Sequence, residues 1–129
     1  MINTSIAIVG LGITSKLAAL SLASTNRKIM IFGQENSKNQ SKNLVTFFST
    51  SSVNFLKKLN LEDVVNESSV INEISCAKIE NYKVNQKFQL NFNEKNSELG
   101  RVVYNKILNE KLNYIISENK NIKLFKNIN

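Results

Sequence analysis

The chain has 129 residues, of which 42% are hydrophobic and 21% charged, and its net charge at pH 7 is +7. Its mean hydropathy of −0.19 and this apolar share indicate one soluble globular domain with a modest core, and they exclude a disordered chain. One cysteine and no histidine exclude disulfides within the chain, Cys/His zinc sites and histidine-based catalysis.

The positive charge is spread along the sequence. Of the 17 basic residues, only Arg27-Lys28 and Lys57-Lys58 are adjacent pairs, and no basic stripe with interleaved aromatic residues is present. We therefore expect no nucleic-acid partner. We expect a cytoplasmic protein, with weak, peripheral attraction to anionic membrane surfaces as the additional option that the charge allows.

Residues 6–32 predict a strand, a glycine turn, a helix and a second strand. An apolar run that begins at Ile6 ends in Gly10-Leu11-Gly12, a segment with apolar helical spacing follows, and residues 29–32 are again β-like. This order is the opening βαβ unit of a dinucleotide-binding fold. The other interpretation of residues 6–23, a signal peptide or a membrane span, is disfavoured because Lys16 interrupts the apolar run.

The glycine turn has the residues that a pyrophosphate needs. Gly10 permits a tight turn after the strand, and Gly12 has no Cβ, so that a phosphate can approach the backbone at the positive end of the helix. The third glycine of the pattern is replaced by Ser15. We expect the cofactor to contact the turn and the first helical residues: Gly10, Leu11, Gly12, Ile13, Thr14 and Ser15. An ordinary buried strand and helix joined by a glycine turn is the alternative.

The position that binds ribose in this fold lacks its acid. A carboxylate is expected at the end of the second strand, where this chain has Gly33, and Glu35 stands two residues later. Glu35 either reaches the ribose from the loop or is a solvated loop acid. Loss of one charge-assisted hydrogen bond would weaken binding by about ten- to a hundredfold.

Residues 44–65 predict one short apolar segment followed by two helical segments. Residues 34–43 are polar and aperiodic, and the apolar run 44–48 is either a buried strand or the approach to a helix. Residues 49–52 offer N-caps for a helix through Val53, Leu56 and Leu59, and residues 61–65 predict one more short turn of helix.

The middle of the chain changes to alternating patterns. Residues 74–82 and 88–92 alternate apolar and polar side chains, which predicts two antiparallel strands joined by residues 83–86. We interpret residues 70–93 as an inserted β segment.

The last part predicts a helix and a returning strand within 102–126. Its helical stripe consists of Val103, Ile107, Leu108, Leu112, Ile115 and Ile116. Residues 119–121 end the helix, and residues 122–125 predict a strand that joins the sheet of the βαβ unit. The whole, 1–129, is predicted as a single α/β, Rossmann-like domain with residues 1–48 as the βαβ opening.

This order resembles the FAD-dependent aromatic monooxygenases, and most closely the ubiquinone-biosynthesis hydroxylases of the 2-octaprenyl-6-methoxyphenol hydroxylase type. Three segments carry the resemblance: IAIVGLGITSKLAALSLAS followed by KIMIF, then STSSVNFLKKLNLEDVV, and LGRVVYNKILNEKL followed by NIKLF. Tyr104 departs from the pattern, because the family usually has glutamate there.

The resemblance implies FAD as cofactor, NADPH as co-substrate and hydroxylation of a polyprenylated phenol in ubiquinone biosynthesis. It implies pyrophosphate contact at Gly10 and Gly12, and a flavin or ribityl contact near Asn105 or Lys106. A solvated helix-face lysine is the equal alternative for Lys106. The family's chains are much longer, so the fold is incomplete relative to the family. A second chain that completes the fold is one option for a partner.

Three functional hypotheses follow. The first is the N-terminal portion of an FAD-dependent monooxygenase that is inactive alone. The second is a small module that binds NAD(P) or another adenine nucleotide. The third is a degenerate, non-catalytic fragment without a ligand, in which Ser15, Gly33 and Tyr104 record relaxed constraint.

Overall fold

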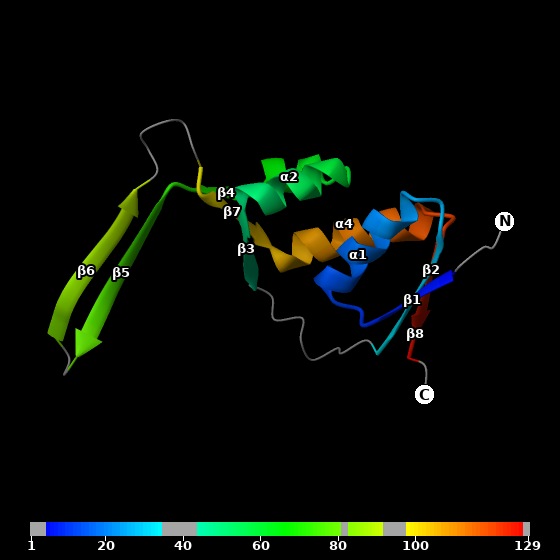
Figure 1. Cartoon of the computed structure of the whole chain (residues 1–129), viewed down its shortest axis with the longest axis horizontal. Helices are drawn as coiled ribbons and strands as arrows, with labels where there is room; N and C mark the ends of the chain where they lie inside the picture. Colours follow the sequence, from blue (N-terminus) through cyan, green and yellow to red (C-terminus); the bar gives the residue numbers. More distant parts are fainter. Residues whose placement is uncertain (1–4, 35–43, 81–82, 92–97, 128–129) are drawn as a thin grey trace.

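The computed structural model describes residues 5–34, 44–80, 83–91 and 98–127. In this part of the chain the strands form a parallel sheet, an antiparallel sheet and a separate hairpin (Figure 1). The strands are β1 (Ser5–Val9), β2 (Lys28–Gly33), β3 (Val45–Ser49), β4 (Ser69–Ile71), β5 (Glu73–Glu80), β6 (Lys83–Asn91), β7 (Gly100–Tyr104) and β8 (Ile122–Lys126). The helices are α1 (Ile13–Ala23), α2 (Thr50–Lys58), α3 (Glu62–Asn66) and α4 (Asn105–Glu118).

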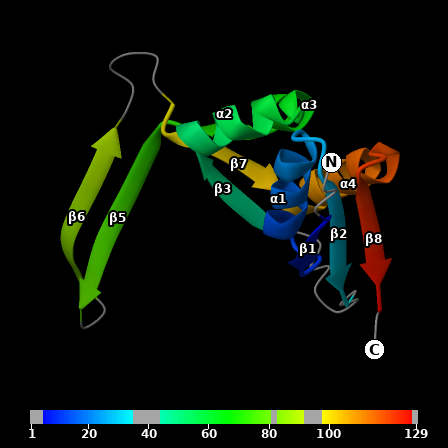
Figure 2. The ribbon, with the colours of Figure 1, turned by 45° about the vertical axis from the view of Figure 1, so that its right-hand side comes forward.

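The first sheet confirms the predicted βαβ opening and the returning strand. Its strands are all parallel in the order β1-β2-β8, with Ile6 opposite Ile29 and Ile29 opposite Ile122. Helices α1 and α4 pack on one face of this sheet, where the β-branched side chains of Ile29 and Ile31 are buried (Figure 2). The α/β class and the Rossmann-like start are therefore as predicted.

The second sheet is antiparallel and has the order β3-β7-β4. Most of the apolar run 44–48 is thus strand β3 of this sheet, and the βαβ opening ends with β2 at Gly33. The side chain of Ser49 accepts a hydrogen bond from the Ser52 amide and caps α2, as the run of hydroxyl residues predicted. A Cβ on Gly100 would overlap the carbonyl oxygen of Phe48, so only glycine lets β3 and β7 approach at this point.

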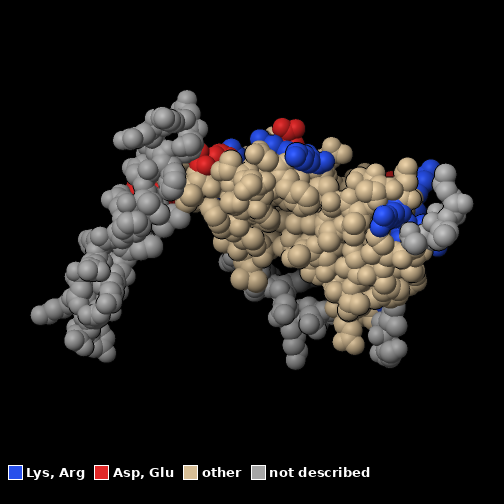
Figure 3. Space-filling model, viewed as in Figure 1, with Lys and Arg blue, Asp and Glu red and all other residues tan. Residues whose placement is uncertain are grey.

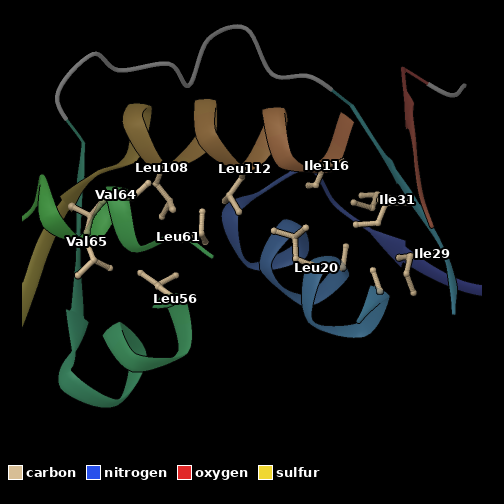
Figure 4. Close-up of a cluster of buried hydrophobic side chains, with 14 of the residues drawn as sticks. Leu20, Ile29, Ile31, Leu56, Leu61, Val64, Val65, Leu108, Leu112 and Ile116 are labelled. Atoms are coloured by element: carbon tan, nitrogen blue, oxygen red, sulfur yellow. The ribbon is translucent and has the colours of Figure 1, made fainter. Parts of the chain in front are cut away.

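The core is held together by α4, which runs past both sheets (Figure 4). Leu108 and Leu112 are fully buried, and Leu108 lies on the side of Leu61 and Val64. Ile116, two turns further along, lies on the side of Ile31 in the parallel sheet. One apolar stripe at helical spacing therefore joins the two halves of the chain.

The predicted helical stripe started too early. Val103 is 2% exposed, but it lies in strand β7, and α4 begins only at Asn105. Val103 and Ile107 are four residues apart, which is also the spacing of two residues on the same face of a helix. The strand forms instead because β-branched residues 102 and 103 pair with β3.

The inserted β segment is confirmed as an antiparallel pair, with a different connection from the one predicted. Strands β5 and β6 pair from Glu73 opposite Asn91 to Glu80 opposite Lys83, and they project away from the rest of the chain (Figures 1 and 2). Residues 83–86 therefore belong to β6, and the connection lies at residues 81–82. The pairing is irregular there, because Lys78 lies opposite Gln86 while Ile79 lies opposite Val84.

Among the described residues, no helix combines the length and hydropathy needed to cross a membrane.

Candidate functional site

The glycine turn after β1 has a conformation that requires glycine. Gly10 has a φ of +122°, and its amide donates a hydrogen bond of 2.7 Å to the carbonyl oxygen of Phe32 in β2. A Cβ on Gly10 would lie 2.9 Å from Oγ of Ser15. Ser15, which stands in place of the third glycine of the pattern, therefore packs directly against the first glycine.

Gly12 is the N-cap of α1 and has no side chain that could cap the helix. A Cβ added there would have no atom of the described residues within 4 Å, so the described part of the chain leaves this helix start accessible to an anion. The first helical hydrogen bond runs from the Lys16 amide to the Gly12 carbonyl, at 3.2 Å. The first turn has no acidic residue, and Thr14 within it is exposed. These features fit a pyrophosphate, which would be bound by backbone amides and the helix dipole.

The position that would bind the ribose of a dinucleotide is less suitable than the glycine turn. A Cβ on Gly33 would lie 2.7 Å from Cγ of Leu11, 3.2 Å from its backbone nitrogen and 3.3 Å from the carbonyl carbon of Gly10. The position expected to hold the ribose acid is thus closed by the turn itself. Glu35, the other candidate, lies outside the described residues.

The start of α4 carries the two residues predicted to contact the flavin. The Asn105 amide donates to the Leu44 carbonyl at 2.9 Å, and Oδ1 of Asn105 accepts from Oγ1 of Thr46 at 2.6 Å. Asn105 is therefore anchored to the segment that forms β3. The Lys106 side chain is 73% exposed, with Nζ 3.8 Å from Oε1 of Glu110. Both alternatives for Lys106, a flavin contact and a solvated helix-face lysine, stay predictions.

A buried lysine connects the two helix starts. Lys16 is 7% exposed and donates from Nζ to Oδ1 of Asn109 at 3.0 Å. In the sequence, Lys16 stands out only because it interrupts an apolar run. Its spacing contained the signal, because position 16 lies between Ile13 and Leu20 on the core-facing side of α1. This hydrogen bond thereby links the N-terminal halves of α1 and α4, the helices that follow the glycine turn and β7.

The shifted carboxyl groups belong to the scaffold. The hydrogen bond from Arg101 lowers the pKa of Glu98, and the hydrogen bond from Lys111 lowers the pKa of Asp63. Within the described part of the chain, no cluster of three or more potential metal ligands occurs. On the face shown in Figure 3, basic side chains lie over α2, which carries Lys57 and Lys58 in its last turn, and uncharged surface separates them from a second basic group.

Sequence comparisons give no family assignment. No protein-family model matches this chain. No curated protein matches it in sequence.

The βαβ opening and its glycine turn define an α/β, Rossmann-like fold class, and solved structures share this fold. The chain is similar to p-nitrophenol 4-monooxygenase PnpA from Pseudomonas putida DLL-E4, with a TM-score of 0.69 and 14% identity, over 95% of this chain and 32% of that one. It is similar to PqsL, a probable FAD-dependent monooxygenase from Pseudomonas aeruginosa, with a TM-score of 0.64 and 12% identity, over 95% and 33%.

A third similar structure is 2-methyl-3-hydroxypyridine-5-carboxylic acid oxygenase, with a TM-score of 0.66 and 15% identity, over 96% of this chain and 32% of that one. At these identities the likeness shows the fold, which is part of the FAD-binding monooxygenase fold. The chain spans about a third of the length of the structures that it matches.

Proposed function

We propose that this chain is the N-terminal FAD-binding portion of a flavin-dependent aromatic monooxygenase, and that it is inactive alone. One observation carries the proposal: the helix start at Gly12 is open to a pyrophosphate, within a fold that matches monooxygenases over 95% of the chain. FAD would supply the oxygen chemistry. The residues of this chain would hold the cofactor's phosphates through the Gly10–Ser15 backbone.

The finer assignment rests on the sequence segments that resemble ubiquinone-biosynthesis hydroxylases. It makes a polyprenylated phenol the substrate and NADPH the co-substrate. In a completed protein, NADPH oxidation stimulated by a polyprenylated phenol supports this assignment. Equal stimulation by small phenols without a prenyl chain contradicts it.

The need for further polypeptide is supported by an uncovered sheet face. Val9, Phe32 and Phe125 are in register across β1, β2 and β8, on the face opposite α1 and α4. Val9 is 85% exposed, and the rings of Phe32 and Phe125 stack with centroids 5.0 Å apart. Because parallel sheets normally have both faces covered, we propose that additional polypeptide, in the same chain or in a second one, covers this face.

Flavin retention tests the proposal. The purified chain is mixed with FAD, the excess is removed, and the visible absorbance is measured beside that of Gly12→Ala, whose added Cβ enters the open space in front of the helix. A retained flavin spectrum that Gly12→Ala loses supports the proposal. Binding of ADP as tight as that of FAD favours the adenine-nucleotide module. A colourless chain without affinity for ADP contradicts both and leaves the degenerate fragment.

A further inference from the structure

The turn after β1 and the end of β2 leave room only for a hydrogen atom at position 33. An added Cβ there would meet Leu11 from its side chain and its backbone, at 2.7 and 3.2 Å, and Gly10 from its carbonyl carbon at 3.3 Å. Separations this short force the neighbouring groups to move. The glycine is therefore required by the close approach of the two segments rather than by backbone conformation.

Neither side of this contact can move freely. Leu11 is partly buried and packs against the hydrophobic core. Gly33 pairs with Lys126 in the parallel sheet, and its carbonyl oxygen accepts a hydrogen bond of 2.9 Å from the Asn127 amide. A side chain at position 33 would have to displace the leucine or strain the end of β2. Leu11 and Gly33 thus form a size-matched pair.

The position of this pair gives it a consequence for ligand choice. In dinucleotide-binding folds, the acid at the end of the second strand accepts hydrogen bonds from the ribose hydroxyls. In this chain position 33 is a glycine and has no such acid. The isobutyl side chain of Leu11, which neither donates nor accepts a hydrogen bond, lies where the Cβ of that acid would be. The backbone amides of the turn, which would bind phosphate, are unaffected because Gly12 stays open.

We propose that Leu11 fills the ribose-acid position of this site, so that the chain selects its ligand by the pyrophosphate and does not distinguish a ribose from a deoxygenated ribose. The inference rests on the proposed nucleotide site and specifies its ligand class as nucleoside diphosphates. The sugar hydroxyls would then contribute nothing to the choice of ligand. It also predicts that both residues must change before ribose recognition appears.

A set of four chains tests the inference: the unmodified chain, Gly33→Glu, Leu11→Ala, and the double variant. Binding of ADP and of 2′,3′-dideoxy-ADP is measured for each by isothermal titration calorimetry. The unmodified chain binds the two ligands within about twofold of each other. The double variant prefers ADP by about ten- to a hundredfold, the effect of one charge-assisted hydrogen bond. Gly33→Glu alone gains no such preference, because Leu11 still obstructs the new side chain.

The outcomes separate the two claims. A preference of the unmodified chain for ADP overturns the inference, although the nucleotide site is still supported. Loss of that preference in Glu35→Gln would then show that Glu35 binds the ribose hydroxyls. No binding of either ligand by any chain overturns the inference, and the retention of FAD then decides separately whether the proposed function stands.

Thermal unfolding is a second test of the contact between Leu11 and position 33. It needs no ligand, and it does not require that Gly33→Glu folds. Gly33→Ala lowers Tm in the unmodified chain, and it lowers Tm less when Leu11 is already alanine. An equal loss on the two backgrounds would show that Leu11 is not the obstructing group, and it would overturn the inference.

Discussion

Lys16 donates a hydrogen bond from Nζ to Oδ1 of Asn109 at 3.0 Å, and this contact joins α1 to α4 near the N-terminal ends of both helices. The lysine is 7% exposed and lies on the side of α1 that also buries Ala19, Leu20 and Ala23. The same helix ends carry the glycine turn and Asn105. A polar contact inside the core therefore fixes the spacing of the two parts of the candidate site.

Removing the acceptor should destabilise the chain. Asn109→Leu deprives the Lys16 ammonium of this partner, and we expect a loss of about 1–3 kcal/mol in the free energy of unfolding, measured by urea denaturation. The double variant Lys16→Met/Asn109→Leu should recover most of that loss, because a well-packed apolar pair costs no desolvation. If the double variant is as unstable as Asn109→Leu, the contact has a different role.

Gly100 should be the least replaceable glycine of the scaffold. Gly100→Ala places a methyl group on the Phe48 carbonyl and against the Phe47 ring. The strands β3 and β7 would have to separate, so we expect a loss of about 3 kcal/mol or more, measured by thermal and urea unfolding. An unchanged Tm for Gly100→Ala would show that the two strands are not packed as described.

The two glycines of the turn should separate stability from binding. Gly10→Ala meets both a φ of +122° and Oγ of Ser15, so we expect it to lose about 1–3 kcal/mol of stability. Gly12→Ala has open space and a φ of −73°, so its stability should change by less than about 0.5 kcal/mol. Its affinity for a pyrophosphate ligand should nevertheless fall more than about tenfold. Equal unfolding curves for both variants would contradict this assignment.

Stability should fall in acid through Glu98. Arg101 holds this carboxylate with Nε–Oε1 and Nη2–Oε2 distances of 3.0 and 2.9 Å and lowers its pKa below the ordinary 4.5. A pKa that is lower in the folded chain adds stability above the unfolded-state pKa, and that stability is lost as the pH falls through the folded-state value. Glu98→Gln should therefore cost at most about 1 kcal/mol at pH 7 and less near pH 3, which lies below the ordinary pKa of 4.5.

The matched control is Glu110→Gln, which removes an exposed pair with Lys106. Its urea midpoint should stay unchanged at both pH values. A cost of Glu98→Gln that is the same at pH 7 and pH 3 would exclude the ion pair as its cause.

Local patterns predicted much of the fold. The βαβ opening, the capped helix after Ser49 and the strand from Ile122 each depend on residues close in sequence, so periodicity and capping were enough. The second sheet was missed, because β7 becomes a strand only by pairing with β3, about fifty residues earlier in the chain. A helical interpretation of Val103 was locally just as consistent.

The candidate site was predictable at its turn and less so around it. Gly10 and Gly12 follow from a pattern with a known steric purpose. The closure of position 33 depends on how far Leu11 reaches across the turn, and the burial of Lys16 depends on Asn109 in a distant helix. Such tertiary contacts leave no periodic trace in the sequence. Whether Asn105 and Lys106 contact a cofactor stays a prediction.

The central claim is that the α1 start binds the pyrophosphate of FAD, and mapping of amide shifts tests it most directly. The ¹⁵N-labelled chain is titrated with FAD and, separately, with inorganic pyrophosphate. The account predicts that both ligands shift the amides of Gly12, Ile13, Thr14 and Ser15 first, and that Gly12→Ala abolishes these shifts while the remaining spectrum stays folded. Shifts confined to other segments, or none at saturating FAD, would contradict the account.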